Sequence, residues 1–249
     1  MPDAFRNEPP IDFSQRANRE RFAQTLAKVR EQFKERSRKR SAGQWLDSLN
    51  PANPREIVGQ VRVSTVDHAQ DAIERAARFF PEWRRGSPEE RAKILSRAAA
   101  TMREKRWELA AWEVFEVGKS WREADADIVE AIDYLNYYAR EMLRLGAPRQ
   151  TQELPGEINI YFYEPRGIAV IIAPWNFPLA ILTGMTAAAL AAGNCALLKP
   201  AEQSPVMAVH LIEILRSAGV PEGACQLLQG GGELGAYLVR SPEIHLIAF

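Results

Sequence analysis

The feature of this 249-residue sequence that most constrains its fold is an uncharged stretch from Gly167 to Leu198. The stretch is long enough to cross a bilayer as a single helix. However, Pro174 and Pro178 interrupt it, and each proline removes a backbone donor and disfavours helix in the residue before it. We therefore expect a buried strand, a turn and a helix rather than a membrane span. The turn places one side-chain amide, Asn176, between the two prolines.

The segments on either side of this turn have the patterns of regular elements. Residues 168–173, "IAVIIA", have the length and β-branching of a strand that is buried on both faces. Residues 179–192 are rich in Leu, Ala and Met, which favour helix, and Gly193 is placed to end that helix. Residues 195–199, "CALLK", predict a second strand.

The same alternation continues to the end of the sequence. Ser204 is placed to cap a helix that begins at Pro205 and ends near Gly219. A strand, a glycine-rich turn with a short helix, and a last strand are expected at residues 224–229, 230–239 and 244–249. Strands that alternate with helices form right-handed βαβ units. Residues 165–249 therefore predict an α/β fold with a doubly wound parallel sheet of the nucleotide-binding type.

The first 150 residues have a different and mostly helical pattern. Residues 45–63 have the pattern of two strands around an Asn-Pro turn. Helices are expected at residues 66–80, from about 88 onwards, at 107–117 and at 121–145. A capping box at Ser87–Glu90 marks the start of the second helix. The first helix should pack one face on a core through Val66, Ala69, Ile73, Ala76 and Phe80.

Two further patterns lie near the middle of the chain. Tyr134, Tyr137 and Tyr138 could form a base-stacking platform, but core packing at helical spacing is the better interpretation. Farther on, polar and apolar residues alternate from Glu157 to Tyr163, as in a strand outside the compact α/β core.

The charge balance argues against polyanionic partners. Lys plus Arg and Asp plus Glu each total 32, so the net charge is zero and favours neither nucleic acid nor an anionic membrane. The strongest basic run, Lys34–Arg40, contains no aromatic residues. Its composition favours a solvated helix end over a localisation signal or a phosphate-binding patch.

Cysteines and histidines indicate neither a disulfide framework nor a metal site. Cys195 and Cys225 lie in apolar surroundings without Cys-x-x-Cys spacing, which indicates buried thiols in a reducing compartment. With no signal peptide in the N-terminal residues, we expect a cytoplasmic protein. The histidines His68, His210 and His245 are scattered singly, so no metal centre is expected.

Three loops follow predicted parallel strands and should meet at the carboxyl edge of the sheet, where such folds bind ligands. They are residues 174–178, 199–202 and 230–235. The glycine-rich loop formally satisfies Gly-x-Gly-x-x-Gly, although adjacent glycines fit that pattern easily and the usual downstream acid is missing. Glu202 can accept hydrogen bonds from ribose hydroxyls, Lys199 can donate, and a carboxylate there favours NAD over NADP. The spacing alone is equally consistent with a plain polar loop.

Asn176 has two interpretations. Its amide can donate to a developing oxyanion, and the flanking prolines would hold its loop in one extended shape. Asparagine is also common in turns for local hydrogen-bonding reasons, and the residues alone favour that structural role.

Motifs in order along the chain carry a family resemblance. "PWNFP", "GNCALLKPAEQSP" and a glycine-rich turn before "IHLIAF" resemble the NAD(P)-dependent aldehyde dehydrogenase superfamily. "FRNEPPIDFS", "SLNPANP" and "LPGEINIYFYEPRGIAVI" are similar to its 1-pyrroline-5-carboxylate (L-glutamate γ-semialdehyde) dehydrogenase branch. The resemblance covers nearly the whole chain.

The resemblance implies a role for each loop. Asn176 would stabilise the oxyanion of a thiohemiacetal, and Phe177 would line the aldehyde tunnel. Lys199 and Glu202 would contact the ribose and adenosine of NAD. The glycine turn is one residue shorter than the family pattern, which leaves open which glycine faces the pyrophosphate. The remaining cofactor contacts implied are Ile172, Ala173, Pro174, Trp175, Gly231, Gly232, Gly235 and Phe249.

The resemblance also implies an activity and an organisation. Residues 1–150 would belong to the cofactor domain, residues 151–164 would supply an oligomerisation strand, and residues 165–249 would form an incomplete NAD-binding core. The family's nucleophilic cysteine and glutamate base come after the position of Phe249, so the catalytic domain is absent and this chain alone should be inactive. The complete enzyme would be a homo-oligomer that oxidises the small aldehyde L-glutamate γ-semialdehyde to L-glutamate in proline degradation. The alternatives are a non-catalytic NAD-binding remnant or partner subunit, or a dehydrogenase of another aldehyde.

Overall fold

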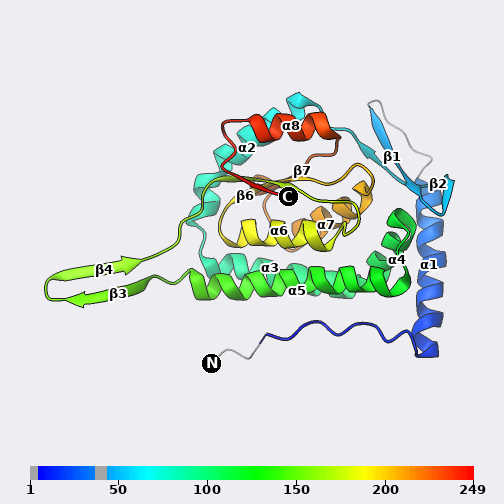
Figure 1. Cartoon of the computed structure of the whole chain (residues 1–249), viewed down its shortest axis with the longest axis horizontal. Coiled ribbons are helices and arrows are strands. Elements are labelled where there is room, and N and C mark those ends of the chain that lie inside the picture. Colours follow the sequence, from blue (N-terminus) through cyan, green and yellow to red (C-terminus); the bar gives the residue numbers. More distant parts are fainter. Residues whose placement is uncertain (1–4, 37–43) are drawn as a thin grey trace.

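The structure is a computed structural model that describes residues 5–36 and 44–249, and the side chains of 34–36 lie outside the described part. A parallel sheet lies at the centre of the body, with helices on both of its faces (Figure 1). The helices are α1 (Arg16–Arg36), α2 (Val66–Arg85), α3 (Pro88–Glu104), α4 (Arg106–Val117), α5 (Trp121–Leu145), α6 (Ala180–Ala191), α7 (Pro205–Ser217) and α8 (Gly232–Arg240). The strands are β1 (Trp45–Asn50), β2 (Asn53–Arg62), β3 (Arg149–Leu154), β4 (Glu157–Tyr161), β5 (Ile168–Ile172), β6 (Cys195–Lys199), β7 (Cys225–Leu227) and β8 (Leu246–Ala248).

The central sheet has four parallel strands in the order β7-β6-β5-β8. Val170 of β5 pairs with Leu197 of β6 on one side and with Ile247 of β8 on the other. The chain therefore builds outwards from β5 to β7 and then crosses back to add β8 beside β5. The strand order reverses between β5 and β8, and ligands of open α/β sheets bind at such a switch point. The predicted doubly wound fold is confirmed.

Helices from both halves of the chain cover the sheet. α6 and α7 lie on one face, with α3 and α5 beyond them, while α2 and α8 lie on the other face (Figure 1). Ile171, Leu197 and Leu198 are buried between these layers, which explains why β5 and β6 are almost entirely apolar. Because α2 packs against the sheet, the N-terminal helices and the sheet share one core.

The helix predictions for the first half are confirmed, with corrections in detail. α2 continues past Phe80 to Arg85, and Val66 does not pack on the core, because it is the first residue after the Thr65 cap and is 47% exposed. Tyr137 is also exposed and contacts the ring of Phe5 edge-on. The sequence analysis did not assign α1, whose Phe22, Val29 and Phe33 are buried.

Two hairpins complete the fold. The predicted hairpin at residues 45–63 is confirmed as β1 and β2. The predicted single strand at 157–163 is instead the second arm of a β3–β4 hairpin that ends at Tyr161 and projects from the body (Figure 1). The first arm, "RQTQEL", was missed because it is polar up to its last residue, Leu154. The basic run Lys34–Arg40 has no described side chains, so its predicted role stays a prediction.

Candidate functional site

The Pro-Trp-Asn-Phe-Pro loop follows β5 at the switch point. Ala173 N donates to Lys199 O at 3.3 Å, which keeps the start of the loop beside the end of β6. Trp175, Asn176 and Phe177 are exposed, whereas Pro178 is buried. Among the described residues, the side-chain amide of Asn176 has no hydrogen-bond partner. The loop therefore presents a free amide donor at the edge where a ligand would bind.

Helix α5 holds the end of this loop. The carboxylate of Asp127, which is fully buried, accepts a hydrogen bond from Ala180 N, the first residue of α6, at 2.5 Å. Lys119 forms an ion pair with Asp127, and its ammonium lies 4.3 Å from the centre of the Phe177 ring. A carboxylate at a helix N-terminus accepts hydrogen bonds from unpaired N–H groups and interacts favourably with the helix dipole. Lys119 and Asp127 thus fix Phe177 and the turn beneath Asn176.

A second carboxyl group lies in the same cluster. Glu113 Oε2 is 3.4 Å from Lys119 Nζ, and the side chain is fully buried. Burial, together with the charge of Asp127, raises the pKa of Glu113 well above its usual value. Burial also raises the pKa of Asp127, but the Lys119 charge and the Ala180 hydrogen bond oppose that rise. Glu113 is therefore the acid of the pair whose pKa is raised more strongly.

The start of α7 is held in a similar way from α4. Val206 N and Met207 N donate to the two carboxylate oxygens of Glu116 at 2.7 and 2.9 Å, and Ser48 Oγ donates to the same group at 2.8 Å. Ser204 occupies the N-cap position of this helix, as predicted, but its hydroxyl makes no capping hydrogen bond. Glu116 occupies the space where that cap would act.

The loop after β6 brings the predicted polar pair together. Lys199 Nζ lies 3.4 Å from Glu202 Oε2 and donates to Pro200 O at 3.3 Å. The Lys199 side chain is buried, whereas Glu202 is exposed. A Cβ placed on Gly235 would lie 3.7 Å from Lys199 Cε, so α8 packs directly against this loop.

The glycine turn borders the same edge but lies far from the switch point along the sheet. It follows β7, the outermost strand, rather than β5. Cβ atoms placed on Gly231 and Gly232 would meet no atom within 4 Å, so a ligand can approach this backbone closely. Helix α8 starts there with no side-chain cap.

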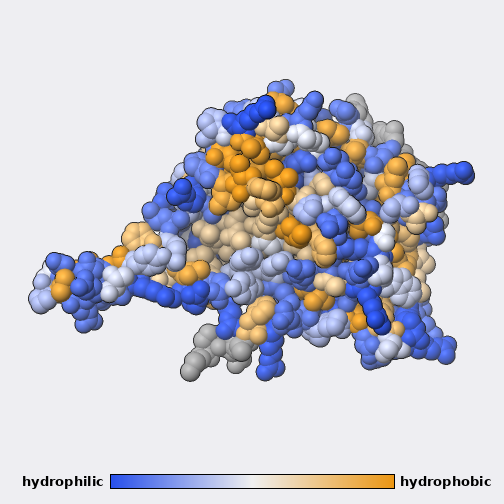
Figure 2. Space-filling model, viewed as in Figure 1, coloured by the Kyte–Doolittle hydropathy of each residue, from blue (hydrophilic) through white to orange (hydrophobic). Residues whose placement is uncertain are grey.

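Strand β8 forms the other border of the switch point and is the outer strand on its side of the sheet. Ala248 pairs with Ile171, which places Phe249 next to the Pro174 loop at the carboxyl edge. Phe249 is 93% exposed, and hydrophobic side chains gather around this part of the surface (Figure 2).

Neither cysteine is suited to nucleophilic attack. Cys195 and Cys225 are free and buried, as predicted, and burial raises the pKa of each thiol to about 12. A reactive cysteine needs an accessible thiolate near neutral pH. Within residues 5–36 and 44–249, no group of His, Cys, Asp and Glu side chains is arranged to hold a metal ion. No helix of that described part is long and apolar enough to span a membrane.

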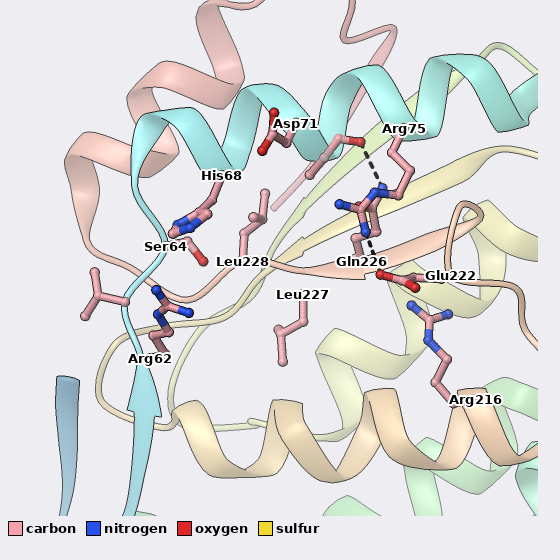
Figure 3. A pocket seen from close by; sticks show the side chains of 12 residues that line it. Arg62, Ser64, His68, Asp71, Arg75, Arg216, Glu222, Gln226, Leu227 and Leu228 are labelled. Atoms are coloured by element: carbon pink, nitrogen blue, oxygen red, sulfur yellow. Dashed lines mark hydrogen bonds and ion pairs between the residues drawn. The ribbon is translucent and has the colours of Figure 1, made fainter. Parts of the chain in front are cut away.

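A separate cavity of about 310 Å³ lies along the open edge of β7 (Figure 3). Two of its charged side chains, Arg75 and Arg216, are paired with other groups of the protein. Arg75 pairs with Glu222 at 2.5 Å, and Arg216 donates to backbone carbonyls that include Pro221 O at 2.8 Å. None of the predicted site residues lines this cavity.

Glu113, Glu116, Lys119 and Asp127 were not predicted as site residues. The available signal for the three carboxylates was their position on helix faces that point to the core, beside apolar neighbours such as Trp112 and Ile128, whereas Lys119 lies in the turn between α4 and α5. Sequence periodicity could mark these positions as buried, but it could not identify the N–H groups that they accept.

Comparisons with known proteins agree with this geometry. Residues 38–249 match the aldehyde dehydrogenase family. Over its whole length, the chain is 44% identical to 1-pyrroline-5-carboxylate dehydrogenase of Geobacillus kaustophilus (strain HTA426). It is 42% identical to 1-pyrroline-5-carboxylate dehydrogenase 2 of Bacillus subtilis (strain 168). The chain spans about half the length (50%) of each of these relatives.

Solved structures give the same result. A crystal structure of 1-pyrroline-5-carboxylate dehydrogenase from Thermus with bound NAD superposes with a TM-score of 0.92 at 41% identity, over 98% of this chain and 49% of that one. Proline utilization A (PutA) from Bdellovibrio bacteriovorus superposes with a TM-score of 0.95 at 40% identity, over 100% of this chain and 27% of that one. The chain therefore belongs to the aldehyde dehydrogenase family and corresponds to the N-terminal half of its 1-pyrroline-5-carboxylate dehydrogenases.

Proposed function

We propose that this chain is the NAD-binding half of an enzyme that oxidises L-glutamate γ-semialdehyde, the open form of 1-pyrroline-5-carboxylate, to L-glutamate in proline degradation. The observation that carries the proposal is the free Asn176 amide at the switch point of the sheet. The similar Thermus enzyme was solved with bound NAD. The 44% identity to a named 1-pyrroline-5-carboxylate dehydrogenase supports the substrate. Oxidation of another aldehyde is the alternative.

The cofactor fits the carboxyl edge of the sheet. Lys199 and Glu202 offer a donor and an acceptor to the ribose hydroxyls of the adenosine half. The exposed Glu202 carboxylate would repel a 2′-phosphate, which favours NAD over NADP. The other proposed contacts are the backbone of Ile172, Ala173, Pro174 and Trp175, the open glycines Gly231 and Gly232, Gly235 beside Lys199, and Phe249.

Asn176 and Phe177 serve the aldehyde. When NAD is bound, it supplies the hydride acceptor for the oxidation. The Asn176 N–H donor is placed to stabilise the oxyanion that forms when a thiolate attacks the aldehyde carbonyl. Phe177, fixed by the Lys119 ammonium, would line the path of the aldehyde. The thiolate would come from outside this chain, because Cys195 and Cys225, its two cysteines, are buried.

We further propose that the β3–β4 hairpin mediates a homo-oligomer of the complete enzyme. Its tip and flanks expose apolar side chains, and Ile158 is 82% exposed. Ile160, Tyr161 and Phe162 are also exposed beside it. Exposed apolar clusters of this kind mark interaction surfaces. A cytoplasmic location accords with the free, buried thiols.

Calorimetric titration of the 249-residue chain with NAD tests the cofactor assignment. We expect saturable binding that weakens at least tenfold, about 1.4 kcal/mol, when Lys199→Met and Glu202→Gln are combined. Lys105→Met combined with Glu104→Gln, two exposed residues away from the edge, is the matched control and should leave binding unchanged. No binding by the unaltered chain would contradict the proposal.

The catalytic role requires the chain joined at Phe249 to the C-terminal half of the Geobacillus kaustophilus relative. Asn176→Ala in that fusion should lower the turnover of L-glutamate γ-semialdehyde by about 10²–10³-fold, the usual cost of one oxyanion donor. NAD affinity should remain unchanged, which separates the amide's role from that of the cofactor contacts. An Asn176→Ala enzyme with full turnover would refute the oxyanion assignment.

A further inference from the structure

The loop that carries Lys199 and Glu202 is tied at both of its ends. Its first residue ends β6, and its last residue, Ser204, precedes the first turn of α7. That first turn donates two backbone hydrogen bonds to Glu116, which comes from α4 in the helical layer. We propose that Glu116 is a positioning residue of the cofactor site, whose carboxylate holds the Lys199–Glu202 loop in its binding conformation. This inference rests on the NAD site proposed above.

Glu116 is a buried carboxylate whose hydrogen bonds come from neutral groups. Its side chain is 2% exposed, and its three donors are Val206 N, Met207 N and Ser48 Oγ. Burial raises its pKa from the usual 4.5 to about 7, and these three hydrogen bonds oppose the rise.

The charged groups on neighbouring elements are engaged with partners of their own. On α5, Asp125 pairs with Arg106 and Asp127 pairs with Lys119. On α7, the His210 ring packs against Trp112 and lies 3.7 Å from Glu213. The same holds on the remaining elements. Asp47 of β1 accepts a hydrogen bond from Gln60, Arg30 of α1 pairs with Glu56, and Glu113 of α4 pairs with Lys119. None of these groups contributes to the raised pKa of Glu116.

Protonation of Glu116 would loosen the loop. The ionised carboxylate accepts hydrogen bonds from both backbone N–H groups and from the Ser48 hydroxyl. The protonated acid carries an O–H donor that faces these three donors, so it can accept fewer hydrogen bonds from them. If only the ionised form holds the loop, the apparent dissociation constant varies inversely with the ionised fraction. NAD should then bind about tenfold more tightly at about pH 8 than at about pH 6.

Calorimetric titration of the 249-residue chain with NAD at both pH values tests this role. The unaltered chain should show the tenfold change. Glu116→Gln should bind at high pH about as weakly as the unaltered chain does at low pH, and its affinity should no longer depend on pH. Glu123→Gln, an exposed carboxylate in the capping box of α5, is the matched control and should keep the full pH dependence. If Glu116→Gln keeps the pH profile of the unaltered chain, the proposal is overturned.

Ser48→Ala gives a second test that retains the carboxylate. The Ser48 hydrogen bond lowers the pKa of Glu116, so its removal should move the midpoint of the NAD-binding profile to higher pH. An unmoved midpoint would contradict the proposal even if Glu116→Gln failed to fold.

A third measurement needs no cofactor and separates this inference from the proposed function. Backbone amide resonances of residues 201–204 should shift between about pH 8 and about pH 6 in the unaltered chain but not in Glu116→Gln. Failure of the chain to bind NAD at any pH would contradict the proposed function, while these resonances would still decide the role of Glu116. Resonances that shift equally in the unaltered chain and in Glu116→Gln would overturn the proposed role of Glu116.

Discussion

Helices α6 and α7 begin at the same edge of the sheet, and each is capped by a buried carboxylate from the helical layer. Asp127 of α5 caps α6, and Glu116 of α4 caps α7. The difference lies in the counter-charge. Asp127 forms an ion pair with Lys119, whereas Glu116 accepts hydrogen bonds from neutral groups alone.

This difference assigns different properties to the two loops. The Pro-Trp-Asn-Phe-Pro loop is fixed by a buried ion pair, and the Lys119 charge and the Ala180 hydrogen bond both favour the ionised form of Asp127, so its geometry should respond less to pH. The Lys199–Glu202 loop depends on a carboxylate whose pKa is raised to about 7, so its geometry should follow pH. The site would therefore hold the amide that we propose as oxyanion donor more rigidly, while the proposed cofactor contacts respond to proton concentration.

Removal of the counter-charge should produce the largest effect. Lys119→Met leaves Asp127 buried without its partner, and breaking one side of a buried ion pair costs about 3–5 kcal/mol. Urea unfolding should show a loss of unfolding free energy in this range. Lys105→Met, at an exposed position, should cost less than about 0.5 kcal/mol. Equal effects of the two substitutions would mean that the ion pair does not hold α6.

Glu116, the cap without a counter-charge, should produce an effect of intermediate size on the pH dependence of stability. The pKa of Glu116 is higher in the folded chain than its usual 4.5, so the folded state binds this proton more tightly. Its contribution to stability therefore falls as pH rises from about 4.5 and is fully lost above about 7. Urea unfolding across this range should show that Glu116→Gln removes part of the decline. Stability and NAD affinity should thus change in opposite directions with pH, and a parallel change would contradict the account.

Ser204→Ala should have a smaller effect than its position suggests. Replacing a serine that caps a helix typically costs about 1 kcal/mol. Because Glu116 rather than the Ser204 hydroxyl binds the first turn of α7, we expect a loss below about 0.5 kcal/mol. A loss of 1 kcal/mol or more in thermal or urea unfolding would show that Ser204 does cap the helix.

Helix α8 differs from α6 and α7 because its start has no side-chain cap. A substitution there should have the smallest effect on stability. Gly231 at this start has φ −83° and open space around it, so another residue fits without strain. Gly231→Asp should stabilise the chain by about a few tenths of a kcal/mol. It should also weaken NAD binding, because the new carboxylate would compete with the cofactor for this backbone. Unchanged NAD affinity would remove the glycine turn from the proposed site.

The sequence predicted most of the sheet because its signal is local. β5, α6 and β6 follow from apolar runs that end at Pro174, Gly193 and Lys199. The polar strand β3 has no such run, and within the described part of the chain it pairs with the neighbouring strand β4 alone. The missing hydrogen bond of the Ser204 hydroxyl has the same origin, since the group that replaces it, Glu116, lies 90 residues away from Val206 in sequence. Local patterns specify elements, whereas contacts between distant segments specify how the site is held.

The candidate site divides in the same way. Asn176, Lys199 and Glu202 were found because they follow strands, and the parallel sheet brings strand ends together. The carboxylates beneath them were missed, because a charged residue inside a helix pattern does not reveal which N–H groups it accepts.

Amide hydrogen exchange in a single sample tests the difference between the two caps most directly. The protection of Ala180, which donates to Asp127, can be compared with that of Val206 and Met207, which donate to Glu116. After correction for intrinsic exchange rates, protection of Val206 and Met207 should fall as pH drops below about 7, while that of Ala180 should change less, because the Lys119 charge opposes protonation of Asp127. Equal pH dependence at all three amides, or none at any of them, would contradict the account.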